Sequence, residues 1–349
     1  MSHETLFFGG FLLLIFLLLA VDLGVFNRQS HEVSFKEATI WTVVWVIFAL
    51  VIFLLIRFYG DSIHSIDSFE KLQAINVAHH HGLKLNSELG FAANVETYRH
   101  ALSLEFISGY LIEYALSVDN IFVIILIFIS FSVPRMYYHR VLFWGIIGAI
   151  LMRFIFIFLS AALIQRFEWI MWLFGAFLIF TGMKMFFKKE NNEPMNVSQH
   201  PVVKVASRFF GVYPRFVKGR FFIVQNNRFL ITPLLLVLLV IEFTDVLFAV
   251  DSVPAVFSVT KDPYIVFASN ICAIIGLRSL FFLISGIMGI FHYLKTGLAV
   301  LLSFIGVKML LESALHIHIN TSVSLSIIFF ILLVSILASV IFPKKEDFP

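Results

Sequence analysis

The sequence has very little charge for its length. Only 13% of its 349 residues are Asp, Glu, Lys or Arg, whereas soluble proteins carry about 25%. Hydrophobic residues make up 60%, and the mean hydropathy is +0.96. Because so few charges cannot cover a water-exposed surface, we expect a chain that crosses a membrane several times.

Two further absences narrow the class. The single cysteine, Cys272, excludes an internal disulfide. No strand-length segments alternate between polar and apolar residues, as the wall of an outer-membrane barrel would require. The net charge is only +3, and the basic residues lie between apolar runs rather than on a nucleic-acid-binding module. The predicted fold is therefore all-α, a polytopic membrane helix bundle in contact with lipid and without a nucleic-acid partner.

A spanning helix needs about 20 mostly apolar residues, and the sequence offers about nine such runs. They cover 5–26, 38–58, 102–131, 139–164, 168–187, 230–258, 263–288, 294–313 and 322–342. The first run is too long for the apolar core of a cleaved signal peptide, so we expect it to be retained. We expect six regions: a two-span hairpin (1–59), an extracytoplasmic loop (60–101), a three-helix unit (102–187), a basic cytoplasmic loop (188–229), a second three-helix unit (230–313) and a C-terminal span with its tail (314–349).

The basic residues predict an orientation, because Lys and Arg accumulate on the cytoplasmic side. With the N-terminus outside, sixteen of them lie in inside segments and six in outside segments. This favours an outside N-terminus and an inside C-terminus. The outside loop contains His79, His80 and His81. Three imidazoles could trap a metal, but we interpret the triplet as polar filler of a solvated loop.

An internal repeat is the strongest pattern. "EYALSVDNIFV" starts at Glu113 and "DVLFAVDSVPAVF" at Asp245, and in each an acid is followed six positions later by a second acid within Val-Asp. Downstream, Arg153 and Arg278 correspond, as do "FTGMKM" (180–185) and "FIGVKM" (304–309). Because three crossings separate the copies, the second unit should lie inverted relative to the first, the plan of many secondary transporters.

The acids within these apolar runs must face the bundle interior. An Asp near the helix centre costs roughly 2.5 to 3.5 kcal/mol on insertion scales. Arg153, Arg278, Lys184 and Lys308 could neutralise the acids structurally, but both lysines lie near span ends and can extend toward water. The surplus of negative charge instead predicts a site for a cation.

The donor types favour a hard divalent ion such as Mg²⁺, Ca²⁺ or Mn²⁺, because the motifs contain oxygen ligands and no Cys or His. The candidate ligands are Glu113, Asp119, Asn120, Glu242, Asp245 and Asp251, with Ser117, Thr244 and Ser252 as additional donors. Asp22 resembles a third Val-Asp copy, and we interpret it as an interface residue.

Spacing adds a structural expectation. Residues six apart lie about 120° apart around a helix and about 9 Å along it, so a straight helix cannot direct both acids of one motif at one ion. Either the two units present different faces, or each motif helix is broken between its acids. Gly109 and Pro254 flank the motifs and are residues at which a local break can occur, so both alternatives stay open.

At these residues the sequence resembles the TerC/Alx family of bacterial integral membrane proteins, within the LysE-like transporter group. "EYALSVDN" is similar to the family's first motif and "EFTDVLFAVDSVPA", from Glu242, to its second, and the likeness runs from "LAVDLGVFNR" to the last span. The outside loop is longer than the resemblance leads us to expect. The resemblance implies manganese export across the cytoplasmic membrane and an association with tellurium resistance, with the six motif residues handling the ion.

Three functions remain open from the sequence. The first is a Mn²⁺ exporter that works by alternating access of the two inverted units, with no resident cofactor and the metal as its substrate. The second is a membrane scaffold that binds metal or senses metal stress without transport. The third is an intramembrane protease with paired Asp residues. We disfavour an enzyme, because a dyad gives no reason for the other acids and the repeated arginines.

Overall fold

The computed structural model describes residues 9–18, 33–79, 81–167, 169–187, 197, 200–225, 228–285, 293–315 and 319–342. Within these residues a short apolar helix, Gly9–Leu18, occupies part of the first predicted span. The predictions for Asp22 and His80 fall outside the described residues.

Helices make up most of the described chain. The α-helices are α2 (Phe35–Tyr59), α3 (Phe69–Ala78), α4 (Phe91–Ser130), α5 (Tyr138–Arg166), α6 (Ile170–Phe187), α7 (Pro201–Phe209), α8 (Pro233–Phe257), α9 (Pro263–Ile275), α10 (Leu277–Ser285), α11 (Leu294–Leu315) and α12 (Thr321–Ile341). Short 3₁₀ helices lie at Gly60–Ser62, Ser87–Leu89 and Arg135–Tyr137. Several starts follow capping chemistry: Ser34 accepts a hydrogen bond from the Glu37 amide, and Pro233 begins α8.

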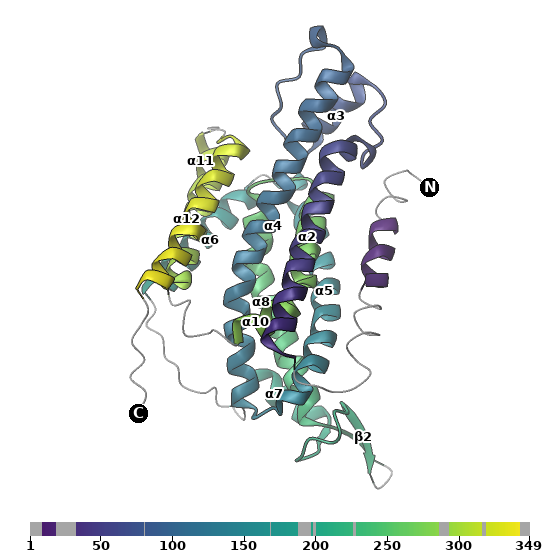
Figure 1. Ribbon diagram of the computed structural model, residues 1–349, viewed down its shortest axis with the longest axis vertical. Coiled ribbons are helices and arrows are strands. Elements are labelled where there is room, and N and C mark those ends of the chain that lie inside the picture. Colours follow the sequence, from purple (N-terminus) through teal and green to yellow (C-terminus); the bar gives the residue numbers. More distant parts are fainter. Residues whose placement is uncertain are drawn as a thin grey trace.

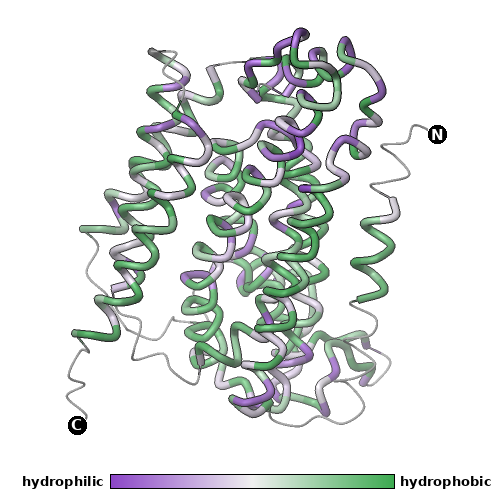
Figure 2. Tube along the Cα trace, turned by 45° about the horizontal axis from the view of Figure 1, so that its top comes forward, coloured by the Kyte–Doolittle hydropathy of each residue, from purple (hydrophilic) through white to green (hydrophobic). Residues whose placement is uncertain are grey.

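Seven of the described helices are long and apolar enough to cross a membrane, and an eighth crossing is formed if the bent pair α9 and α10 counts as one span. This confirms the predicted all-α polytopic fold. In Figure 1 the long α4 runs through the bundle beside α2 and α8, while α6, α11 and α12 gather at one side. Hydrophobic residues dominate the middle of the bundle, and hydrophilic residues concentrate toward its two ends (Figure 2).

The two polar stretches are more structured than a loop. α4 begins at Phe91, eleven residues before the apolar run, and α3 packs at the same end of the bundle. The basic stretch forms α7 and a small sheet of strands β1 (Gly211–Val212), β2 (Phe222–Gln225) and β3 (Arg228–Ile231) in the order β1-β3-β2. β1 runs parallel to β3, and β2 runs antiparallel to it. Figure 1 shows α3 at one end of the molecule and α7 with β2 at the other.

Of the two alternatives for the motif helices, the break between the acids is wrong. α4 is continuous through its motif, and α8 is continuous to Phe257 even though it contains Pro254. Pro254 lies three residues before the end of α8, so only the last turn of the helix follows the backbone hydrogen bond that proline removes. Gly109 instead permits a close helix contact, since a Cβ added there would lie 2.7 Å from the Ser269 Oγ of α9. The described break falls between α9 and α10, which meet at an angle of 41° around Gly276.

The α6 and α11 helices carry the two "G-x-K-M" segments and pack closely against each other. A Cβ added at Gly306 would lie 2.6 Å from the Gly175 carbonyl oxygen, closer than real side chains approach. Small residues on both helices therefore set this contact, as is common where helices meet in a membrane.

Candidate functional site

The two motifs meet around one arginine in the bundle interior. Glu113 on α4 and Arg153 on α5 are both fully buried and form an ion pair. The Nη2 of Arg153 also lies 3.8 Å from the Oδ1 of Asp245 on α8. One guanidinium thus joins the first acids of the two motifs, which are 132 positions apart in the sequence. Since a buried charge needs a partner, this arrangement accounts for the depth of all three side chains.

Arg153 has two further partners. Its Nη1 donates to the Ser252 Oγ at 3.2 Å and to the Asn270 Oδ1 at 2.7 Å. Asn270 lies on α9, fully buried, and the sequence reading did not select it. The sequence feature that could have identified Asn270 is its amide side chain within the largely apolar segment "FASNICAII". The Arg153 cluster therefore draws on α4, α5, α8 and α9.

The second acids of the motifs form a separate group. Asp251 accepts a hydrogen bond of 3.2 Å from the Thr181 hydroxyl of α6, and it lies within electrostatic range of Asp119 and Lys184. Asp119 and Asp251 are both partly buried. Because α4 is continuous, the six-residue spacing turns Glu113 and Asp119 toward different neighbours. The alternative in which each unit presents different faces is the one that the structure adopts.

Glu242 occupies a position that only a glycine on the facing helix allows. A Cβ added at Gly148 of α5 would lie 2.1 Å from both carboxylate oxygens of Glu242. Glu242 also lies within electrostatic range of Asp245, one turn along α8. Gly148 is therefore a second residue that the sequence reading missed, and nothing in its apolar surroundings distinguishes it.

Several polar atoms near the motifs are buried without a hydrogen-bond partner among the described residues. They include the Ser117 Oγ, the Asn120 Nδ2 and the Asp245 Oδ2. Burying such atoms unpaired costs free energy, so a position that retains them calls for an explanation. The Thr244 hydroxyl, by contrast, donates to the Val240 carbonyl of its own helix at 2.7 Å.

The other predicted cations lie in different surroundings. Arg278 is buried on α10, and Lys184 is exposed on α6. Lys308 is buried on α11, where its Nζ donates to the Ser258 carbonyl at 2.9 Å and lies 3.8 Å from the Glu312 carboxylate. Ser258 caps the C-terminal end of α8, so Lys308 stabilises the carbonyls of that helix end.

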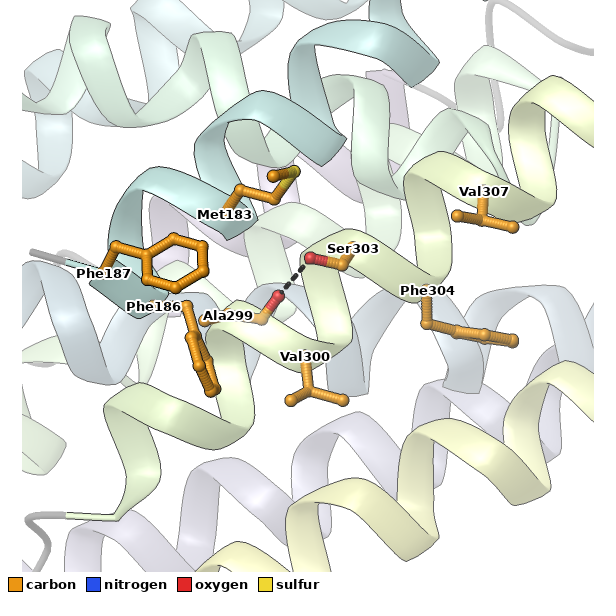
Figure 3. Close-up of a pocket in the computed structure, with 8 residues that line it drawn as sticks. All are labelled: Met183, Phe186, Phe187, Ala299, Val300, Ser303, Phe304 and Val307. Carbon is orange, nitrogen blue, oxygen red and sulfur yellow. Dashed lines mark hydrogen bonds between the residues drawn. The ribbon is translucent and has the colours of Figure 1, made fainter.

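Chemically, the site offers hard oxygen donors from both motif helices. Mn²⁺, Mg²⁺ and Ca²⁺ are bound by carboxylates, amide carbonyls and hydroxyls. The Asp245 Oδ2, and Asp119 together with Asp251, fit the donor chemistry of a divalent cation. A pocket between α6 and α11 does not, because its lining, shown in Figure 3, contains no carboxylate and consists of apolar side chains apart from Ser303.

A second group of titratable residues lies at the α3 end, outside the spans. The side chain of His81 is only 1% exposed, and its Nδ1 lies 2.9 Å from a Glu105 oxygen, so the expectation of solvated filler is wrong for this residue. Burial lowers the pKa of His81, but the Glu105 carboxylate raises it to a value above the ordinary one. For the Asp262 carboxyl, burial acts in the opposite direction and raises the pKa. The hydrogen bond and charge of His64 outweigh burial and lower this pKa to about 2.

Comparison with known proteins agrees with the motifs. Residues 98–347 match the model of the integral membrane protein TerC family. An uncharacterized membrane protein of Myxococcus xanthus is 42% identical over 95% of this chain and 91% of its own length. The putative membrane-bound redox modulator Alx of Salmonella typhi is 39% identical, and that of Escherichia coli K12 is 38% identical, each over 98% of this chain and 96% of the relative. No solved structure matches the chain. The matched region contains both acidic motifs, and the chain belongs to the TerC family of integral membrane proteins.

Proposed function

We propose that this protein exports a divalent metal cation, Mn²⁺ in particular, across the cytoplasmic membrane. One observation carries the proposal: carboxylates from the motif helices α4 and α8 converge in the bundle interior, at Arg153 and again between Asp119 and Asp251. A protein that only crosses the membrane has no need for these acids, because each costs free energy when removed from water.

The charge balance supports a mobile cation rather than a fixed structural network. Glu113 and Asp245 share the single guanidinium of Arg153, while Glu242 lies beside Asp245 and adds a further negative charge. In the proposed cycle, Arg153 holds the first pair of acids together when no ion is bound. Mn²⁺ then binds between Asp119 and Asp251, with Asn120 as a neutral ligand. The carboxylates take up protons as the ion leaves, since metal ligands must be deprotonated while the ion is bound.

The relative placement of the loops supports the proposed orientation. The basic segment that contains α7 and the sheet contacts the start of α5, where Arg140 lies over the Phe221 ring at 5.4 Å. The segment of α3 and residue Asp262 lie together at the other end. Because basic residues mark the cytoplasmic side, the α7 end faces the cytoplasm in this proposal and the α3 end faces outward.

A proteoliposome assay tests the proposal. The purified protein is reconstituted, and Mn²⁺ flux is followed with an internal fluorescent indicator for the wild type, Asp119→Asn and Asp251→Asn. We expect both substitutions to abolish flux, because each removes a charge from the pair that holds the ion. Glu96→Gln is the matched control, since its exposed carboxylate pairs with Arg57 at the surface and should leave flux unchanged.

One observation favours a second function, a metal-binding or metal-stress membrane protein without transport: Arg153 already pairs with two of the acids. Association with tellurium resistance would then be indirect. Mn²⁺ binding to the detergent-purified protein, measured together with absence of flux in proteoliposomes, would support this function. Flux that is unchanged in both Asp variants would contradict the exporter.

A further inference from the structure

Three segments that are distant in the sequence bring metal-ligand side chains together at the α3 end. His64 lies between the 3₁₀ helix at Gly60–Ser62 and α3, His79 caps the end of α3, and Asp262 caps the start of α9. One ligand atom from each lies within 4.8 Å of the others. The His64 Nε2 and the Asp262 Oδ2 are already 2.8 Å apart.

The cluster is buried and incompletely satisfied. His64 is 2% exposed and Asp262 is fully buried. The Nδ1 of His79 and the Nε2 of His81 are buried and have no hydrogen-bond partner among the described residues. Buried nitrogens without a partner are costly, and two of them side by side indicate a missing ligand. The three imidazole rings lie close together: the centroids of His64 and His79 are 5.0 Å apart, and those of His79 and His81 are 5.9 Å apart.

We propose that His64, His79 and Asp262 bind a first-row transition-metal cation of the Zn²⁺ class. Imidazole nitrogens and a carboxylate oxygen form the ligand set of such ions, whose bonds are about 2.0 to 2.2 Å long. Ligand atoms within 4.8 Å of one another need to move inward by only about 1 Å to reach that geometry. His79 is partly exposed, which gives the ion a route in from the aqueous phase.

The neighbouring residues form the support that such a site needs. His81 contacts Glu105 through its Nδ1 at 2.9 Å, and its ring lies beside that of His79. The Thr260 hydroxyl donates to the other Glu105 oxygen at 2.6 Å and accepts from the Asp262 amide at 3.3 Å. Hydrogen bonds of this kind fix the orientation of metal ligands. They also join the loop of α3 to the loop that precedes α9.

This site is separate from the acidic motifs and does not rest on transport. It uses imidazoles, whereas the described motif residues are oxygen donors, and it lies on the polar loops rather than within α4 and α8. Bound metal would cross-link the end of α3, at His79, to the start of α9, at Asp262. We therefore expect the metal to raise thermal stability.

The test uses full-length protein in detergent, freed of metal with a chelator and titrated with Co²⁺ and with Zn²⁺. Strong visible absorption by bound Co²⁺ reports a tetrahedral protein site, and Zn²⁺ should displace the Co²⁺. His79→Ala is the informative variant, because the His79 Nδ1 has no partner to leave unpaired. We expect it to weaken Zn²⁺ binding at least 100-fold, whereas His100→Ala, an exposed histidine on α4, should bind like the wild type.

Two comparisons make the result decisive. Asp251→Asn should retain the Co²⁺ spectrum, because Asp251 belongs to the acidic motifs. Loss of the spectrum in Asp251→Asn with retention in His79→Ala would overturn the proposal. It would be overturned equally if the wild type shows no Co²⁺ absorption, or if Zn²⁺ does not raise its unfolding temperature. The cluster would then be a metal-free hydrogen-bond network.

Discussion

At the scale of single residues, Arg153 is the most consequential side chain in the interior. It lies among Glu113, Asp245, Ser252 and Asn270, which come from three other helices. Removing one member of a buried ion pair costs roughly 3 to 5 kcal/mol, because the remaining charge is left without a partner.

Arg153→Gln should therefore lower the free energy of unfolding by roughly 3 to 5 kcal/mol. The double variant Arg153→Gln/Glu113→Gln should recover part of this loss, since it no longer buries an unpaired carboxylate. Thermal unfolding of the detergent-purified protein measures both effects. Arg166→Gln, at an exposed position on the same helix, is the control. Strictly additive effects of the two substitutions would contradict the pairing.

Gly148 offers a sharper test of the acidic site. Gly148→Ala places a Cβ 2.1 Å from the Glu242 oxygens, so the carboxylate must move. We expect Mn²⁺ flux to fall roughly 10-fold or more, because small displacements of functional groups have large effects. Gly145→Ala is a matched control on the same helix, where the new Cβ would meet only the Ile241 side chain at 3.6 Å. Equal flux in the two variants would argue against a role for Glu242.

At the scale of elements, the contact between α6 and α11 depends on glycine. The methyl group of Gly306→Ala would lie 2.6 Å from the Gly175 carbonyl oxygen, which belongs to the backbone and cannot rotate away. We expect a loss of roughly 1 to 3 kcal/mol of stability, the usual cost of overpacking. Val307→Ala, on the exposed face of α11, should change unfolding much less. If both variants unfold alike, the close contact is not required.

The continuity of α4 and α8 determines which group each motif acid joins. An unbroken helix turns residues six apart by about 120°, so each helix contributes one acid to the Arg153 cluster and one to the pair of Asp119 and Asp251. The sequence showed the spacing but left two ways to accommodate it. In the structure, the motif helices stay continuous and their acids face different neighbours, because α5 supplies Arg153 as one partner and α6 supplies Thr181 as another.

At the scale of the whole molecule, the polar segments gather at two opposite ends (Figure 2). The proposed orientation puts α3 outside and the small sheet in the cytoplasm. Cysteine labelling tests it directly, because Cys272 is buried and gives little background. In right-side-out vesicles, a membrane-impermeant maleimide should label Glu70→Cys, and label Lys218→Cys only after permeabilisation. Both positions are exposed. The reverse pattern would invert the orientation.

Much of this architecture was predictable from the sequence. Long apolar runs predicted the helices, because no other backbone form satisfies its hydrogen bonds in lipid apart from a closed barrel. The acids within those runs predicted a polar interior site, because a charged side chain that faces lipid costs free energy. The inverted relation of the two three-helix units stays a prediction, supported by the ordered match of the motifs.

By itself, the sequence determined the membrane class of the protein and which acids lie within its apolar helices, since both follow from the local cost of burying charge. Only the tertiary structure decided which side chains meet. Asn270 reaches Arg153, Gly148 admits Glu242, and His79 lies beside His64 and Asp262 through contacts between distant segments. Such contacts depend on how helices pack in three dimensions, and no periodicity along the chain records them.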